Sequence, residues 1–212
     1  MSAVPRGLPG PLPAGERMLW QGAPDWRLLA RRALHTRKLV LYFGLITVWV
    51  GACRLLEGAA PSDALRAVAW AAFIGTAPIL LAFAYAWAAA RASVYTITDR
   101  RLVLQLGLAL PVTINLPFTR IASADLNRRA DGSGDISVSL LGGDRLSYAV
   151  LWPHVRPRRF GHPQPTLRAL PDVQPVAQLL ARALAASADM AAPVLEGQPK
   201  AETAAPHAAM AA

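Results

Sequence analysis

The side chains that could carry out chemistry in this sequence are few and scattered. Its four histidines, His35, His154, His162 and His207, match no zinc or iron ligand spacing. The single cysteine, Cys53, excludes a disulfide within the chain and a cysteine-based zinc site. No carboxylate pair and no Ser–His–Asp order stands out as an acid–base or nucleophilic group. The sequence therefore predicts a protein that is not an enzyme, binds no cofactor or metal, and acts by binding.

One Pro-rich loop combines residue types that are common in binding sites. It contains Trp152, His154 and Arg156, followed by Arg158 and Arg159. Tryptophan and arginine dominate many interfaces, and prolines reduce the entropy that a loop loses when it docks. We interpret these five residues as a candidate partner-binding patch. The alternative is a rigid loop that packs on its own domain, with its arginines in solvent.

A second candidate surface precedes the first long apolar run, where tryptophan and basic residues stand together. Basic residues near an anionic bilayer each contribute about 1 kcal/mol to membrane binding, and they also act as a plain orientation signal. Nucleic acid is not an expected partner, because the basic residues flank apolar runs and no nucleic-acid-binding motif appears. The membrane-surface candidates are Trp26, Arg27, Arg31, Arg32, Arg37 and Lys38.

The elements that position these residues begin with two apolar runs, at 39–56 and 67–90. The chain of 212 residues is 54% hydrophobic and 17% charged, with a net charge of +9. At 1.5 Å per residue, either run is long enough to cross most or all of a bilayer core of about 30 Å. We therefore predict a membrane protein in which two spans form a helical hairpin.

The flanking charges predict how this hairpin is oriented. Lys and Arg gather before the first run and after the second, whereas the short loop between the runs has no basic excess. By the positive-inside rule, both termini are expected in the cytoplasm. The predicted division is a cytoplasmic N-terminal segment at 1–38 with a basic amphipathic stretch, the hairpin at 39–90, a cytoplasmic domain at 91–187 and a disordered Ala/Pro-rich tail at 188–212.

Beyond the second run the hydrophobic period changes to two, which indicates β-strands. We count six strands in residues 93–150, the last two at 136–140 and 146–150 with a turn between them. The Pro-rich segment 151–171 is expected to lack regular structure. A helix from Asp172 to about residue 186 then places its apolar residues on one face. The domain is thus α+β, with antiparallel strands closed by a C-terminal helix.

Two short motifs resemble those of bacterial pleckstrin-homology (PH)-like domains that flank membrane spans. One reads Gly-Glu followed by Leu-Trp-x-Gly-x-Pro, and the other reads Tyr-x-Ile-Thr-x-x-Arg. The resemblance implies a PH-like antiparallel β-sandwich or barrel that follows the transmembrane hairpin. The matching residues are Gly15, Glu16, Leu19, Trp20, Gly22 and Pro24 in the first motif, and Tyr95, Thr98 and Arg101 in the second.

Segments 108–117, 134–136 and 151–157 are similar to the PuhB family of photosynthetic-complex assembly proteins of phototrophic bacteria. This resemblance implies a non-enzymatic assembly factor, or chaperone, for the photosynthetic reaction centre with its core light-harvesting complex, in the inner (intracytoplasmic) membrane. The implied partners are reaction-centre subunits and other photosynthetic-complex assembly proteins, beside anionic membrane lipid, with self-association left open. The alternative is a general membrane-flanked PH-like protein that binds lipid headgroups or another membrane protein.

Overall fold

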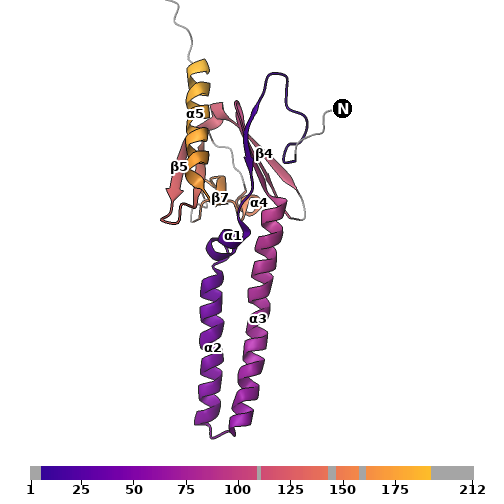
Figure 1. Ribbon diagram of the computed structural model, residues 1–212, viewed down its shortest axis with the longest axis vertical. Coiled ribbons are helices and arrows are strands. Elements are labelled where there is room, and N and C mark those ends of the chain that lie inside the picture. Colours follow the sequence, from indigo (N-terminus) through magenta and orange to yellow (C-terminus); the bar gives the residue numbers. More distant parts are fainter. Residues whose placement is uncertain (1–5, 109–110, 143–146, 158–160, 192–212) are drawn as a thin grey trace, which may run out of the picture.

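A pair of long helices carries a domain of antiparallel strands at one end (Figure 1). The computed structural model describes residues 6–108, 111–142, 147–157 and 161–191. The helices are α1 (Trp26–Arg32), α2 (Thr36–Leu56), α3 (Pro61–Ala92), α4 (Tyr148–Leu151) and α5 (Val173–Ala191), with the 3₁₀ turn η1 (Phe118–Arg120). The strands are β1 (Met18–Gly22), β2 (Val94–Thr98), β3 (Arg101–Leu106), β4 (Val112–Pro117), β5 (Ile121–Arg128), β6 (Gly134–Leu140) and β7 (Thr166–Leu170).

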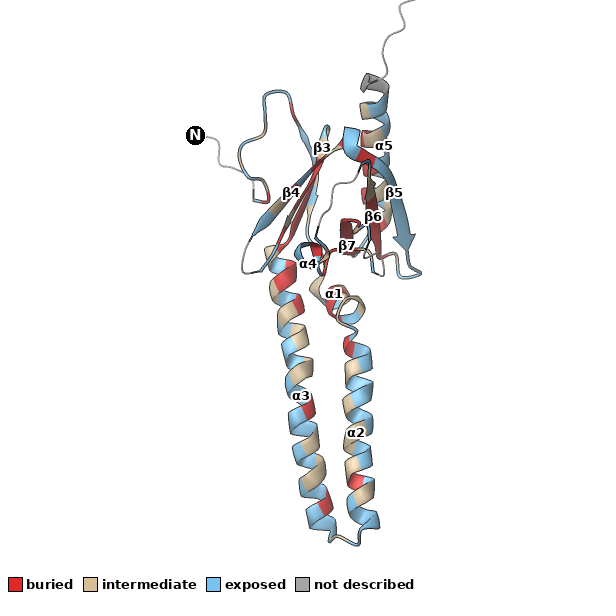
Figure 2. Cartoon of the chain, turned by 180° about the vertical axis from the view of Figure 1, so that it is seen from behind, coloured by how far each residue is buried: buried red, intermediate tan, exposed pale blue. Residues whose placement is uncertain are grey.

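Helices α2 and α3 are long and apolar enough to cross a membrane. The predicted runs 39–56 and 67–90 lie inside them. Helix α3 begins earlier, at Pro61, because proline fits the first helical position, and Asp63 in the first turn complements the positive end of the helix dipole. Figure 2 shows that most of the hairpin surface is exposed or half-buried, whereas buried residues gather in the strands and at the junction.

Two glycines let the hairpin helices approach closely. A Cβ atom at Gly51 would lie 2.8 Å from a side-chain carbon of Val68, and one at Gly75 would lie 3.1 Å from Phe43. Small residues at such positions allow backbones to pack, and this packing is a main source of helix association in lipid. Gly51 and Gly75 are therefore used for packing within the hairpin itself.

The strands form two sheets, one in the order β1-β2-β3-β4 and one in the order β5-β6-β7, linked in sequence by η1. Within the described residues no strand pairing joins the sheets, so the sandwich alternative fits and barrel closure is not found. Helix α5 contacts β5, β6 and η1. The core contains Tyr95, Ile97, Leu102, Leu104, Ile136, Val138, Leu167 and Leu180, each at most 1% exposed.

Strand β1 places residues from before the hairpin inside the first sheet. It pairs with β2 in an antiparallel register, with Trp20 opposite Ile97 and Gly22 opposite Tyr95. The chain thus leaves the sheet, runs through α1 and the hairpin, and returns directly into β2. The predicted division treats 1–38 as a separate segment, and the structure instead gives part of it to the domain. Both ends of the hairpin therefore lie on the same side.

Two of the predicted elements in the second sheet are wrong. Of the expected strand at 146–150, residue 146 lies outside the described residues and residues 148–150 belong to α4. Strand β6 pairs with the preceding strand β5 in a hairpin and with β7 on its other side. The segment 151–171, expected to be irregular, contains β7, which two prolines flank without interrupting. Prolines at strand ends are tolerated because they remove no ladder hydrogen bond there.

The predicted C-terminal helix is confirmed as α5, which begins at Val173 and ends at Ala191. Its expected apolar face is buried at Val173, Val176 and Leu180. Burial of side chains of this kind stabilises a fold by about 1.5–3 kcal/mol each. Of the predicted disordered tail, residues 192–212 lie outside the described residues.

A bidentate ion pair ties the two PH-like motifs together. Arg101 donates from Nε and Nη2 to the Glu16 carboxylate, over 2.7 and 2.6 Å. The Glu16 side chain is only 3% exposed. The hydrogen bond from Arg101 is the main cause that holds the pKa of Glu16 below its usual range. Beside the pair, the hydroxyl of Thr98 accepts the backbone N–H of Arg101 and closes the β2–β3 turn.

We expect Glu16→Gln to lower the free energy of unfolding by roughly 3 kcal/mol, because it leaves the Arg101 guanidinium without its buried counter-charge. Thermal unfolding of the detergent-solubilised protein measures the effect. The matched control is Glu57→Gln, which removes an exposed pair with Arg54 and should change the free energy by less than about 0.5 kcal/mol. Equal effects of the two substitutions would contradict this role of the ion pair.

Candidate functional site at the junction of hairpin and domain

The loop that follows α4 lies against the last turns of α3. A pocket of about 300 Å³ opens there, and the ring of Trp152 lies 5.3 Å from the ring of Tyr85. Trp152 is 43% exposed. Among the described members of the predicted partner-binding patch, Trp152 is therefore the one that other molecules can reach in this pocket. The pocket is lined by Tyr85, Ala89, Ser93, Gly107, Leu108, Val112, Ala149, Val150, Trp152, Pro153 and His154.

His154 is buried and lies inside a continuous chain of hydrogen bonds. Its Nδ1 lies 2.6 Å from the hydroxyl of Tyr95, and its Nε2 lies 2.9 Å from Oγ of Ser93. Ser93 donates its own hydroxyl proton to the carbonyl of Ala89 in α3, over 2.7 Å. Ser93 must therefore accept from Nε2–H, which assigns the neutral tautomer with Nδ1 as the acceptor of the Tyr95 hydroxyl.

The chain continues from Tyr95 into the second sheet. The backbone N–H of Arg168 in β7 donates to the hydroxyl of Tyr95 over 3.2 Å. Burial, followed by the charge of Arg168, lowers the pKa of His154 to about 3, and burial raises the pKa of Tyr95. Both groups are thus neutral near pH 7. The arrangement positions the domain on α3.

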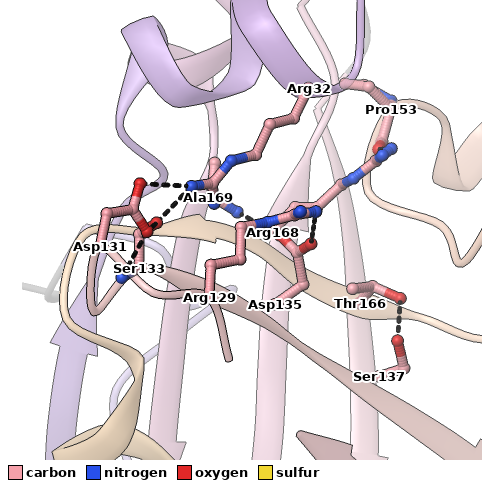
Figure 3. A network of polar contacts seen from close by, with 10 residues as sticks. All are labelled: Arg32, Arg129, Asp131, Ser133, Asp135, Ser137, Pro153, Thr166, Arg168 and Ala169. Atoms are coloured by element: carbon pink, nitrogen blue, oxygen red, sulfur yellow. Dashed lines mark hydrogen bonds and ion pairs between the residues drawn. The ribbon is translucent and has the colours of Figure 1, made fainter. Parts of the chain in front are cut away.

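A second polar network lies beside this chain and is drawn in Figure 3. Arg168 donates from Nη1 to the carbonyl of Pro153 over 2.7 Å, which holds the loop to β7. The Asp135 carboxylate accepts the backbone N–H of Ala169 over 2.8 Å. Ala169 adopts a φ of 57°, an uncommon value for a residue with a side chain, and its carbonyl accepts the N–H of Asp25 at the start of α1. Strand β7 therefore positions both the loop and α1.

Helix α1 is clamped between α3 and the β5–β6 turn. Asp25 caps its N-terminus by accepting the N–H of Leu28 over 2.9 Å. Leu29 is buried against the small residues at the end of α3. Arg32 forms an ion pair with Asp131 over 2.9 Å and also contacts Ser133 (Figure 3).

The predicted membrane-surface residues divide into two groups. Arg32 is turned into the domain, with 14% of its side chain exposed. Arg27, Arg31, Arg37 and Lys38 are exposed at the junction. The basic stretch is also not one helix, because residues 33–35 separate α1 from α2. These four exposed basic residues are accessible to an anionic membrane surface.

Trp26, the remaining member of the membrane-surface set, is half-buried and packs edge-on against Phe83 of α3, with ring centroids 6.5 Å apart. The guanidinium of Arg27 lies over its ring at 5.3 Å. Trp26 thus connects α1 to the hairpin at the level where α3 approaches the domain.

The structure separates the other members of the predicted partner patch. Arg156 donates to Asp125 over 2.5 Å and to Gln164 over 3.0 Å, so its charge is used within the domain. Arg158 and Arg159 lie outside the described residues. Sequence reasoning missed Arg168 and Ser93 as members of the site, because nothing in the local pattern indicates which hydroxyl and which backbone N–H meet a given histidine.

The model of the Bacterial PH domain family matches residues 44–184. The chain belongs to this family. The bacterial PH domain match covers the hairpin from residue 44 of α2 onward, both sheets except β1, and most of α5. It begins after the Gly15–Pro24 motif, so the ion pair of Glu16 joins the matched region to a segment outside it.

A relative of this bacterial PH domain protein comes from Rhodobacter capsulatus and is described as an uncharacterized 23.7 kDa protein in the puhA 5′ region. The two chains are 40% identical over 200 residues, which are 92% of this chain and 91% of the relative. The similarity therefore includes the N-terminal strand as well as the hairpin. No solved structure matches the chain significantly.

The buried neutral state of His154 predicts a pH dependence of stability. The unfolded chain binds a proton at this histidine below about pH 6.5, whereas the folded chain does so only near pH 3. The free energy of unfolding should therefore be highest above pH 6.5 and fall toward pH 3, by up to about 1.4 kcal/mol per pH unit from this group. Thermal unfolding between pH 7.5 and pH 4 should show a shallower pH slope in His154→Gln.

The matched control for this measurement is His162→Gln, because His162 is exposed. It retains every other titrating group and should follow the pH slope of the unsubstituted protein. A slope that is the same in all three proteins would contradict the assignment of a neutral, buried His154.

Proposed function

We propose that this protein is a non-enzymatic membrane assembly factor, or chaperone, for the bacterial photosynthetic reaction centre with its core light-harvesting complex. The observation that carries the proposal is the 40% identical relative in the puhA 5′ region, which is a photosynthesis gene region. The partners would be reaction-centre subunits and other photosynthetic-complex assembly proteins.

The hairpin supports a role of this kind because its outer surface is apolar and is left uncovered by the rest of the described chain. Val48 and Trp49 on α2, and Phe73 and Leu81 on α3, are each at least 70% exposed. In a bilayer such surfaces contact lipid or the helices of other proteins. A factor that binds membrane subunits during assembly needs both a lipid-compatible surface and a domain outside the bilayer.

We further propose that the hairpin crosses the inner membrane with both termini in the cytoplasm. The exposed basic residues Arg27, Arg31, Arg37 and Lys38 lie at the junction, whereas Arg54 and Arg66 at the far end are each paired with a carboxylate. This distribution favours a cytoplasmic domain.

An alkaline phosphatase fused at Gly58, between the two long helices, should be active in the periplasm. The same enzyme fused after the last residue should be inactive, because it stays in the cytoplasm. A cytoplasmic reporter such as a fluorescent protein supplies the converse control at both positions. The opposite pattern of activities would contradict the proposed orientation.

Deletion of the gene in its phototrophic host tests the function directly. We expect lower near-infrared absorbance of the reaction centre in isolated membranes, with restoration when the gene is supplied in trans. The relative from Rhodobacter capsulatus is a second complementing gene, since its similarity extends over nearly the whole chain. Normal reaction-centre absorbance in the deletion strain would contradict the proposal.

A second candidate function is the recognition of anionic lipid or another membrane protein by a general membrane-flanked PH-type domain. The four exposed basic residues at the junction favour it. The deletion experiment separates the two functions, because this candidate predicts unchanged reaction-centre absorbance. Affinity purification from photosynthetically grown membranes, followed by mass spectrometry, identifies whether reaction-centre subunits are bound.

A further inference from the structure

The tryptophans of α3 mark two levels along the hairpin. Trp70 and Trp87 are 17 positions apart, which corresponds to about 26 Å along a helix. This length is close to the bilayer core of about 30 Å, and tryptophan is enriched at both of its boundaries. Both side chains are exposed, and the guanidinium of Arg91 lies over the Trp87 ring at 4.9 Å. The Trp87 level thus has the composition of a membrane–water interface.

Part of the sheet domain lies at this same level. Trp152 contacts Tyr85, which stands two positions before Trp87 on α3. The end of β3 is also close to the end of α3, because β2 follows α3 directly and pairs Val94 with Gln105 near the end of β3. Topology therefore directs Gly107 and Leu108 toward the hairpin, and the contact of Trp152 with Tyr85 places the loop after α4 there as well.

These segments present an apolar surface on the domain, which we call the membrane-proximal shelf. It consists of Leu108, Val112, Val150 and Trp152, which are 51%, 38%, 47% and 43% exposed. All four line the pocket at the junction, and no Asp, Glu, Lys or Arg is among the residues that line it.

We propose that the membrane-proximal shelf inserts into the headgroup region of the bilayer, so that lipid contacts the domain as well as the hairpin. The proposal rests on the membrane insertion that is part of the proposed function. The shelf is continuous with the lipid-compatible surface of α3, because it adjoins Tyr85 and lies at the Trp87 level.

Lipid fits this surface better than a protein partner does. Four half-exposed side chains offer much less area than the about 800 Å² that each partner buries in a stable protein interface. Arg91 and Arg27, each over a tryptophan ring, supply basic charge at the depth of anionic headgroups. An aromatic residue flanked by arginines is a common anchor at an interface.

The experiment uses the full chain with Cys53→Ser and one introduced cysteine, labelled with an environment-sensitive fluorophore. The shelf positions are Val150→Cys and Trp152→Cys. Leu19→Cys is the matched control, because Leu19 is 42% exposed and lies on β1 near the end of the sheet away from the hairpin. Each protein is reconstituted in pure vesicles of phosphatidylcholine with an anionic phospholipid, and doxyl-labelled lipids quench the label according to depth.

We expect shallow doxyl groups to quench positions 150 and 152 several-fold more than position 19, with a blue-shifted emission at both shelf positions. Equal quenching at all three positions would overturn the proposal. The proposal would also be overturned if the labels on the shelf were shielded only when the protein is in native membranes. That result indicates that a protein, and not lipid, covers the shelf. If the substitution at Trp152 disturbs the loop, the label at position 150 still tests the proposal.

A label at Val48→Cys, in the middle of α2, separates this proposal from the proposed function. Val48 is 70% exposed on the hairpin. If deep doxyl groups quench position 48 and the shelf remains unquenched, only the shelf proposal fails. If position 48 is also unquenched, the hairpin does not insert, and both proposals are overturned.

Discussion

A chain of hydrogen bonds through the buried imidazole of His154 holds the sheet domain on the end of the hairpin. It runs from the N–H of Arg168 through Tyr95, His154 and Ser93 to the carbonyl of Ala89. Every proton in the chain has one acceptor, so the loss of one group leaves a neighbour unpaired in a buried place, which costs about 1–3 kcal/mol. Because no loop separates α3 from β2, the orientation of the domain depends on this chain and on the packing of α1.

The position of β1 makes the hairpin an insertion within a sheet. Strands β1 and β2 pair although the whole of α1, α2 and α3 lies between them in sequence. A flexible segment of that length would oppose the pairing through the entropy of loop closure. The packed hairpin removes most of this cost, since its two helices return the chain to its starting point. The hairpin and the domain therefore stabilise each other, and the Glu16–Arg101 pair closes the arrangement.

The sequence predicted correctly those elements that are determined by the residues within them. The apolar runs, five of the six predicted strands and the face of α5 follow from hydrophobic period and length. The period-two segment at 146–150 failed as a strand because alternation alone does not supply a pairing partner, and β7 already occupies that edge of β6. The site was harder to predict, since Trp152 and His154 differ by two positions yet one is exposed and the other buried. The contacts of His154 with Tyr95 and Ser93, 59 and 61 positions away, decide this.

The basic residues of the chain divide into two roles that net charge alone does not distinguish. Arg32, Arg101 and Arg156 are each paired with a carboxylate of the domain, so their charges fix the positions of elements. Arg27 and Arg31 remain exposed beside the hairpin. A rigid junction presents these free charges at a fixed position beside the last turns of α3. Binding by a preorganised surface loses less entropy than binding by a flexible one. In the proposed contact with anionic lipid, the internal pairs would therefore act indirectly, by holding the free charges in place.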